Sequence, residues 1–382
     1  VVMQRLREVV EDSESAVDAD GKLTERGQEL FEKLDTQRQL LIQDYKNFNR
    51  EDPWSVCSYY CSQIMLRSSW HLDEYLEVLE KPASLADMAK AVRTAMAKAQ
   101  LEMLVHGNVT PSEAQAAAEI VSTTLKELGA EPLEKPLRRE VTELPEKSTT
   151  IFEYDLVAKN PAQENSCTQN VYQVGAIGED LNRDACLSLA CHVASTSAYQ
   201  RLRTEEQLGY IVQAGGWVEQ QVAGLCVIVQ GPRLAPRDVD ERIEAWLASF
   251  AAELDKMSDE EFERNVEAVV SERTQRYGRM SQETSRHWAE IQSRRYRFDR
   301  TPKAVAALKA LKKADVVRFF GEYLAAGAEK RRKLSVRVLG TSAGDARSEP
   351  VDDGALLRTL EDIRALHGKT TSCKVPEPAE IP

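Results

Sequence analysis

Arg203 and Tyr210 are the two side chains whose types and spacing best suit chemistry in this sequence. They lie in the stretch LRTEEQLGYIV, residues 202–212, between two patterned segments. Small and apolar residues at helical spacing predict a helix at 187–199, and an apolar run bounded by glycines predicts a strand at 210–214. We therefore expect a helix end, a short polar elbow and a strand start that place Arg203 and Tyr210 near one another.

A guanidinium and a phenol both donate hydrogen bonds, and a donor aimed at developing negative charge accelerates a reaction by about 10² to 10³. A structural interpretation is also open. Arg203 would then be a cation at a helix C-terminus, and Tyr210 a strand aromatic with its hydroxyl at the surface. Composition and spacing alone favour this structural interpretation.

The stretch His71-Leu72-Asp73-Glu74-Tyr75 is the part of the sequence most similar to a known zinc-binding motif. In H-x-x-E-H, two histidines flank a glutamate base on one helix, but here Tyr75 takes the place of the second histidine. Because the loss of one of three protein ligands should abolish a catalytic zinc site, we interpret the stretch as a helix start with a polar face. The other four histidines are dispersed, so we expect no metal bound by this chain alone.

The seven cysteines stand in apolar contexts, which suits a reducing compartment with buried thiols better than a disulfide framework. Cys57 and Cys61 share one helix face, and without a second pair we expect them in the core rather than on a metal. These residues support a cytoplasmic location.

The formal net charge of -12 argues against binding to nucleic acid or to an acidic membrane surface. One basic tract with interleaved aromatics, residues 273–300, also contains acidic side chains, so an ordinary solvated helical face is expected there. No apolar run approaches the roughly 18 residues of a membrane span. We therefore expect neither nucleic acid nor a membrane as a partner.

The chain of 382 residues is long enough for two domains, and the residue pattern changes between them. The first part is helical, with one extended run at 101–105, and three prolines with many charges indicate a linker at 131–147. The second part predicts strands at 149–157, 169–176, 210–214, 225–230 and 334–339, and helices at 181–200, 236–255, 258–277, 282–295, 303–311 and 314–325. Strand pairs followed by helices predict an α+β fold with helices on one face of a sheet.

An internal repeat supports the division into two domains. A helix that begins at Ala86 is followed by the extended run 101–105, and a helix that begins at Ala314 is followed by the strand 334–339; a glycine ends each copy. Two copies of helix, turn, strand and glycine indicate that each domain closes with the same unit. The first domain would then be incomplete, with strands missing upstream of Val1.

Residues 202–212 resemble a signature of the C-terminal half of the insulysin and pitrilysin zinc peptidases. Further stretches resemble the same family in the same order, from about Arg38 to Leu339: LVHGN at 104–108, WAEI at 288–291, YRFDR at 296–300 and VRVL at 336–339. Several spaced matches in the right order are a strong signal. This resemblance, rather than the spacing of Arg203 and Tyr210, favours a catalytic role for the two residues over the structural interpretation.

The resemblance implies four similar αβ domains that form two bowl-shaped halves around a chamber. Each domain has an antiparallel-rich sheet with helices on one face. Residues 1–145 would be the later part of the third domain, 146–345 the fourth domain, and 346–382 a C-terminal extension with one short helix. The chain would therefore be a bowl-shaped half chamber with an incomplete first domain.

The resemblance also implies the roles of the site residues. Arg203 would bind a backbone carbonyl of the substrate peptide, Tyr210 would donate a hydrogen bond to the oxyanion of the tetrahedral intermediate, and Tyr199 would wall the pocket beside the scissile bond. Zinc and its H-x-x-E-H motif belong to an N-terminal half that this sequence lacks. We therefore expect that half and peptide substrates as partners, a possible homodimer, and no activity for this chain alone.

The favoured function is half of a zinc-dependent endopeptidase that encloses and degrades peptides. The alternative is a non-catalytic peptide-binding or assembly subunit of the same fold. Retention of both Arg203 and Tyr210 argues against the alternative, because a binding surface has no need of an oxyanion donor.

Overall fold

The computed structural model describes residues 15, 16, 18, 22–82, 84–135, 138–344 and 354–376. Contacts within the chain divide it into two compact units, each built from three segments. The first unit takes its residues from Val1–Asn47, Trp70–Arg138 and Arg279–Trp288, and the second from Phe48–Ser69, Arg139–Gly278 and Ala289–Pro382. The domain boundary at residue 145 rests on the linker composition of 131–147 and stays a prediction.

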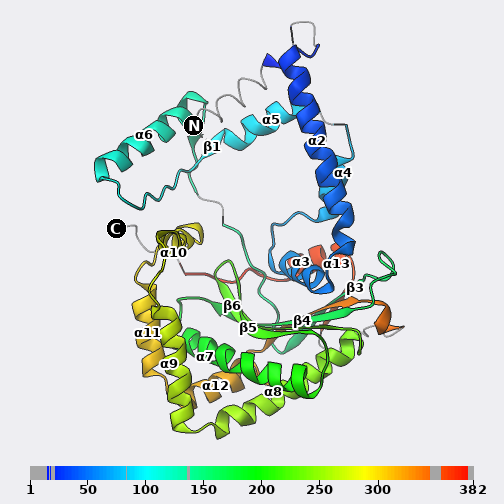
Figure 1. Cartoon of the computed structure of the whole chain (residues 1–382), viewed down its shortest axis with the longest axis vertical. Coiled ribbons are helices and arrows are strands. Elements are labelled where there is room, and N and C mark those ends of the chain that lie inside the picture. The colour runs from blue at the N-terminus through cyan, green and yellow to red at the C-terminus, as the bar shows by residue number, and fades with distance from the viewer. Residues whose placement is uncertain are drawn as a thin grey trace. The chain divides into compact units, whose positions relative to one another are not determined.

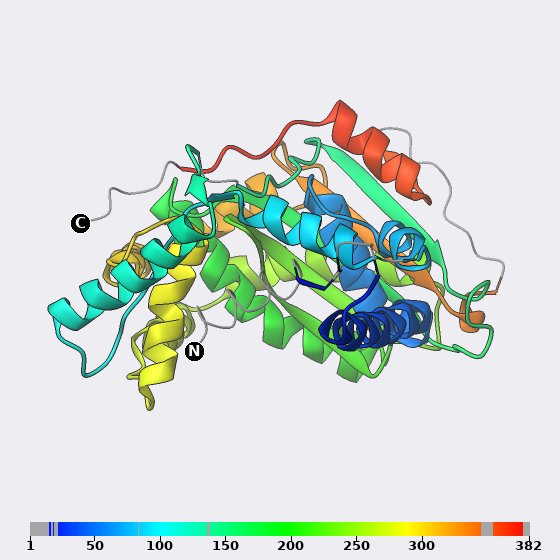
Figure 2. The same cartoon turned by 90° about the horizontal axis from the view of Figure 1, so that it is seen from above.

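The first unit is built mainly of helices. They are α2 (Glu25–Asn47), α4 (Leu72–Leu79), α5 (Leu85–Met96), α6 (Pro111–Glu127) and the start of α10 (Met280–Gln292). Helix α2 is one long rod, seen from the side in Figure 1 and down its axis in Figure 2. A short parallel pairing joins β1 (Lys98–Ala99) to β2 (Glu131–Pro132).

The strand predicted at 101–105 is wrong. Its residues are neither helix nor strand, and within the described ranges they form no ladder with another segment. An extended run becomes a strand only when a neighbouring strand takes up its backbone N–H and C=O groups. An apolar pattern cannot show whether such a neighbour is present.

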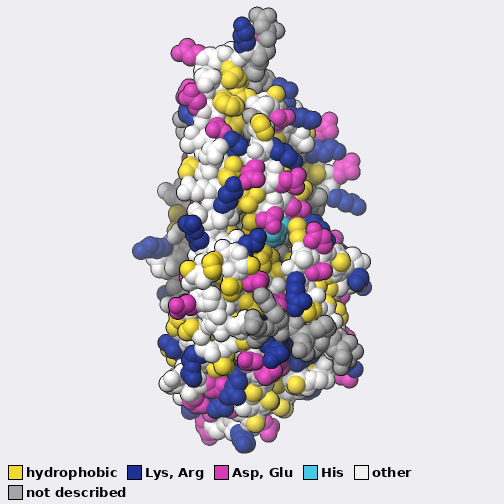
Figure 3. Space-filling view, turned by 90° about the vertical axis from the view of Figure 1, so that its right-hand side faces the viewer, with side chains coloured by type: hydrophobic (Ala, Val, Ile, Leu, Met, Phe, Trp, Pro, Cys, Tyr) yellow, Lys and Arg dark blue, Asp and Glu magenta, His cyan; other side chains and the backbone are white. Residues whose placement is uncertain are grey.

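Charges of both signs are intermingled on the surface of the first unit. On α2, Glu29 lies 2.5 Å from Arg26 and 2.6 Å from Lys33, at the helical spacings that bring side chains together. Figure 3 shows the same mixture of basic and acidic side chains over the face that it displays. Such a mixture lacks the basic excess by which proteins displace counterions from nucleic acid.

The second unit contains a six-stranded mixed sheet in the order β5-β6-β4-β7-β3-β8. Its strands are β3 (Ser148–Asp155), β4 (Ser166–Ala176), β5 (Ile211–Glu219), β6 (Val222–Gly231), β7 (Arg332–Leu339) and β8 (Ala355–Leu357). The pairs β5–β6, β6–β4 and β4–β7 are antiparallel, and β3 is parallel to both β7 and β8. The predicted α+β class is confirmed.

Helices cover both faces of this sheet (Figure 1). One face packs against α7 (Leu181–Ala198), α8 (Pro236–Lys256) and α12 (Lys313–Tyr323), and α3 (Pro53–Met65) lies on the other. The prediction of helices on one face holds for α7, α8 and α12, whereas α3, from earlier in the chain, and α13 (Leu360–Lys369) belong to the cluster on the other face. The remaining elements are the short helices Phe48–Arg50 and Thr341–Ala343, α9 (Asp259–Thr274) and α11 (Arg300–Ala310).

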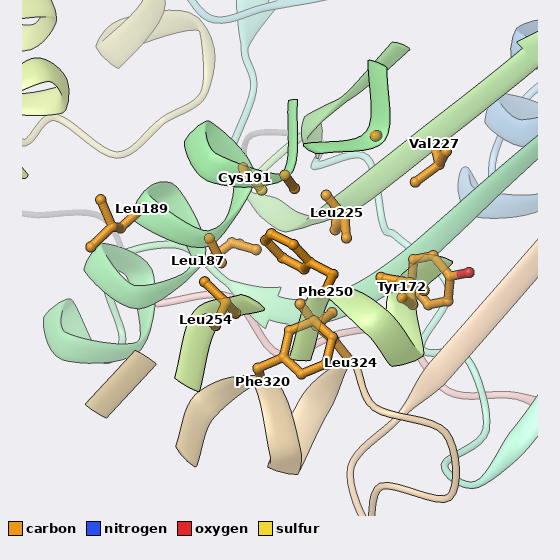
Figure 4. Close-up of a cluster of buried hydrophobic side chains, with 14 of the residues drawn as sticks. Tyr172, Leu187, Leu189, Cys191, Leu225, Val227, Phe250, Leu254, Phe320 and Leu324 are labelled. Carbon is orange, nitrogen blue, oxygen red and sulfur yellow. The ribbon is translucent and has the colours of Figure 1, made fainter. Parts of the chain in front are cut away.

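Two hydrophobic clusters result, because successive residues of a strand point to opposite faces. On β4, Val171 packs with the cluster around α3, and Tyr172 with the cluster around α7 and α8. Figure 4 shows the second cluster, where Phe250 of α8 lies among side chains from the sheet and from other helices. A sheet buried on both faces gives a firm support for the loops at its ends.

The cysteines and the basic tract have structural roles. All seven cysteines are free thiols, and burial raises the pKa of Cys57 and Cys61 well above the usual value. In the basic tract, Arg295 and Arg300 form ion pairs with the buried carboxylate of Glu290, at 3.1 and 2.9 Å. No helix in the described part of the chain is long and apolar enough to span a membrane.

Asp240 of α8 anchors that helix to the sheet through a buried ionic network. Its carboxylate lies 2.6 Å from Nζ of Lys333 and 2.5 Å from Nη2 of Arg337, both on β7, and it accepts a hydrogen bond from Asn170 of β4. All four residues are buried. Burial raises the pKa of Asp240, but the charges of Lys333 and Arg337 outweigh it and hold that pKa below its usual value.

We expect Asp240→Asn to lower the free energy of unfolding by about 3 to 5 kcal/mol, because it removes the buried carboxylate that pairs with both Lys333 and Arg337. The matched control is Asp238→Asn on the same helix. Its half-exposed carboxylate lies near Arg237, so a loss below about 1 kcal/mol is expected. Urea unfolding at pH 7, followed by circular dichroism, measures both. Equal losses in the two variants would contradict the anchoring role.

The same network predicts a loss of stability in acid. The folded pKa of Asp240 lies below the unfolded value of about 3.9, so the pair contributes its full stability above that pH. The contribution falls as the pH drops through the folded pKa. Unfolding free energies at pH 7 and pH 3 should therefore differ more for the native chain than for Asp240→Asn.

Candidate active site

The helix that carries Arg203 changes its winding just before the elbow. Helix α7 ends at Ala198, and the chain continues as a π-helix over Tyr199–Glu205. A π-helical turn is wider than an α-turn and is often found at functional sites. Here it is the segment that presents Tyr199 and Arg203. The predicted helix end is confirmed, but its π-helical form was not foreseen.

Two buried leucines hold the ends of the elbow. Leu202 and Leu208 both belong to the hydrophobic cluster around α7, and the backbone N–H of Leu208 donates to the carbonyl of Leu202 at 3.0 Å. Between them, Gln207 has a φ of 52°, in the left-handed region. The elbow is thus closed by backbone bonds and anchored in the core, and its polar residues project outward.

A close crossing of two backbones positions the end of the elbow. A Cβ atom on Gly209 would lie 2.0 Å from the carbonyl oxygen of Gln230, and one on Gly231 would lie 2.6 Å from Cα of Gly209. Both separations are far below van der Waals contact, so only glycine fits at either position. The crossing brings Tyr210, the next residue, beside the end of β6.

Charged side chains brace the elbow from outside. The Glu206 carboxylate pairs with Arg201 at 2.9 Å and with Arg242 of α8 at 2.6 Å. The Arg233 guanidinium donates to the backbone carbonyls of Gln207, at 3.0 Å, and Glu206, at 3.3 Å. These bonds tie the elbow to α8 and to the chain that leaves β6.

Tyr199, Arg203 and Tyr210 line one open cavity of about 520 Å³. The two tyrosines are 55% and 50% exposed, and Arg203 is half-buried. Within the described residues, the Arg203 guanidinium makes no hydrogen bond or ion pair, so its donors are available to a ligand. The Tyr210 hydroxyl accepts a hydrogen bond from Nε2 of Gln230. The structure brings the three predicted residues together.

Sequence reasoning missed several residues of this site. Gln207, Pro232 and Arg233 also line the cavity, and Gln230 contacts Tyr210 from the neighbouring strand. A glycine and a proline that follow an apolar run signal a turn, which places 231–232 at a strand end. No local pattern shows that this strand end lies beside residues 207–210.

The residues that the structure describes do not fit a zinc site. The described part of the chain has no group of three or more His, Cys, Asp or Glu side chains that could hold a metal. His71 is buried at the N-cap of α4, where its Nδ1 accepts from the backbone N–H of Asp73 and the Glu74 carboxylate accepts from the N–H of His71. The apparent metal motif is therefore a capping box.

The chain is similar to known proteins over most of its length. Residues 189–288 match the family model described as PQQ synthase PqqF-like, C-terminal lobe domain 4. The chain is 29% identical over 353 residues to insulin-degrading enzyme-like 1, peroxisomal, of Arabidopsis thaliana, covering 89% of this chain and 36% of that protein. It is 30% identical over 305 residues to insulin-degrading enzyme of Homo sapiens, covering 79% and 29%.

Solved structures show the same fold. The crystal structure of pitrilysin matches with a TM-score of 0.76 and 22% identity, over 90% of this chain and 35% of that chain. A peptidase M16 inactive domain from Pseudomonas fluorescens matches with a TM-score of 0.54 and 12% identity, over 84% and 72%. The chain thus spans about a third of the length of the relatives that it matches in sequence.

We expect Gly209→Ala to lower the free energy of unfolding by about 1 to 3 kcal/mol or more, because the added methyl group overlaps the Gln230 carbonyl. Gly215→Ala, in β5, is the matched control. No atom lies within 4 Å of a Cβ there, so stability should change by less than about 1 kcal/mol. Thermal unfolding of both variants measures the difference. Equal stability would show that the crossing tolerates a side chain.

Proposed function

Because the chain belongs to the insulysin and pitrilysin family of peptidases and is similar to the C-terminal half of its members, we propose that it supplies half of a zinc-dependent endopeptidase that encloses and degrades peptides. The observation that supports the proposal most directly is the shared cavity of Tyr199, Arg203 and Tyr210. The activity of the whole protein is part of the proposal, since this chain covers about a third of its relatives.

Arg203 would bind the substrate. Its guanidinium carries five N–H donors in a planar fork, and a backbone carbonyl of an extended peptide is a suitable acceptor. The side chain is half-buried and has no described partner that a substrate would need to displace. Binding of a peptide carbonyl therefore breaks no described hydrogen bond or ion pair of Arg203.

Tyr210 would stabilise the transition state. When water attacks the scissile carbonyl, negative charge develops on its oxygen, and a hydroxyl donor at that point lowers the barrier. The Gly209 crossing holds Tyr210 in place before substrate arrives, so little reorganisation is needed during the reaction. Tyr199, more than half exposed on the same cavity, would pack against the side chain beside the scissile bond.

Zinc would be bound by an N-terminal half, where it would activate the attacking water. The site would be complete only when the two halves meet, so opening and closing of the chamber would gate turnover. This chain alone would then be inactive.

We also propose a cytoplasmic location, in keeping with seven free thiols. One relative is described as peroxisomal, so the location needs its own test. Fluorescence microscopy of the tagged protein with a peroxisomal marker distinguishes the two compartments.

A non-catalytic subunit is the second candidate. It is favoured by the similar fold of a structure described as an inactive peptidase domain. The donors of Arg203, which have no described partner, and the Tyr210 side chain on the same cavity favour the enzyme instead. Peptide cleavage by the complete protein, and its loss on zinc chelation, separate the two candidates.

We expect Tyr210→Phe to lower kcat about 10²- to 10³-fold in the complete protein while KM changes little, because the hydroxyl acts on the transition state. The control is Tyr75→Phe, which removes an exposed hydroxyl from α4 and should leave kcat unchanged. Steady-state cleavage of a fluorogenic peptide measures both constants. Near-normal kcat in Tyr210→Phe would remove the role assigned to that residue.

We expect Arg203→Ala to raise KM about tenfold or more, because a charged hydrogen bond contributes about 1.5 to 3 kcal/mol to binding. Arg203→Lys should restore binding only in part, since an ammonium cannot reproduce the planar fork. Arg276→Ala, beyond the end of α9 on the surface, is the control. If KM is unchanged in Arg203→Ala, that side chain does not bind the substrate.

A further inference from the structure

Gln230 uses both ends of its side-chain amide although it is 0% exposed. Its Oε1 accepts a hydrogen bond from the backbone N–H of Trp54 at 2.7 Å, and its Nε2 donates to the hydroxyl oxygen of Tyr210. The residue stands near the end of β6, opposite Ile211 of β5. One buried amide therefore joins the start of α3 to the phenol of the candidate site.

The backbone N–H of Trp54 fixes the direction of both hydrogen bonds of the Gln230 amide. A backbone N–H can only donate, so the oxygen of the Gln230 amide must face Trp54 and its nitrogen must face Tyr210. The Tyr210 oxygen consequently accepts, and its own hydrogen must point elsewhere. In the described part of the chain the hydroxyl has no second partner, and the side chain lines an open cavity.

The N-terminus of α3 places a positive electrostatic potential beside the Gln230 amide. Trp54 is the second residue of that helix, Pro53 has no N–H, and the Asp52 side chain makes no capping bond. Gln230 thus satisfies an N–H group at the positive end of the helix dipole. Successive hydrogen bonds polarise one another, so the amide becomes a stronger donor to Tyr210.

We propose that Gln230 is a positioning residue that directs the hydroxyl proton of Tyr210 into the cavity, toward the oxyanion of the substrate. The inference rests on the proposed function of Tyr210. Gln230 does not touch the substrate itself. It occupies one lone pair of the phenol oxygen, which fixes the orientation of the O–H bond and makes the hydroxyl a stronger hydrogen-bond donor to an acceptor in the cavity.

Gln230→Glu tests the direction of the hydrogen bond between Gln230 and Tyr210. The variant keeps an acceptor oxygen for the backbone N–H of Trp54, but it replaces the NH₂ donor that faces Tyr210 with a carboxylate oxygen, which can only accept. The hydroxyl would then donate to the carboxylate and lose its orientation toward the substrate. We expect kcat to fall about tenfold to a hundredfold and KM to stay within about twofold in the complete protein. Gln213→Glu, exposed on β5, adds the same charge and should leave both constants unchanged.

A double variant separates positioning from general damage to the fold. If Gln230 acts through Tyr210, then Gln230→Glu should cause no further loss of kcat in a Tyr210→Phe background. An equal loss in both backgrounds would overturn the proposal and leave Gln230 a structural role. Normal kcat in Gln230→Glu beside a strongly reduced Tyr210→Phe would also overturn it.

Failure of the proposed function gives a different result, because Tyr210→Phe itself would then retain turnover. Should Gln230→Glu fail to fold, as judged by thermal unfolding, Gln230→Met replaces it in the same cycle. Loss of one neutral hydrogen bond predicts a fall in kcat of about two- to tenfold for Gln230→Met, again absent in the Tyr210→Phe background. An unchanged kcat in Gln230→Met would overturn the proposal.

Discussion

The candidate site depends on one steric constraint, the crossing of two backbones at Gly209 and Gly231. A side chain at either position would push the elbow away from the end of β6. Because Tyr210 follows Gly209 directly, the crossing sets where its ring leaves the backbone, and it brings the hydroxyl within reach of Gln230. The geometry of the cavity is therefore a consequence of the absence of two Cβ atoms.

The crossing keeps its position because the elbow is anchored to α7 and α8, which pack on the sheet. Leu202 and Leu208 anchor the elbow in the cluster around α7, and Arg242 connects Glu206 to α8. Helix α8 is in turn fixed to the sheet by the buried pairs of Asp240 with β7. Buried ion pairs contribute little net stability compared with apolar packing, but they allow one alignment of helix and sheet. The position of the elbow depends on that alignment, because Arg242 of α8 pairs with Glu206 of the elbow.

The polar groups of the cavity suit an acceptor ligand with partial negative charge. Arg203 and Tyr210 offer donors, whereas the nearby carboxylate of Glu206 is already paired with Arg201 and Arg242. In the proposed function, such a site would bind a carbonyl and then the oxyanion formed from it.

Local periodicity and short spacings in the sequence were enough to predict the α+β class, most helices and strands of the second unit, and the grouping of Tyr199, Arg203 and Tyr210 near one elbow. They also allowed wrong inferences where pairing decides the outcome, as at 101–105. Three features depend on how distant segments pack: the π-helical turn, the glycine crossing and the contact of Gln230 with Trp54, which lies 176 positions away. The burial of Arg337 beside Asp240 also lay beyond an alternating strand pattern, which places a charged residue in water. Contacts between distant segments depend on how the layers pack, and residue periodicity contains no information about that packing.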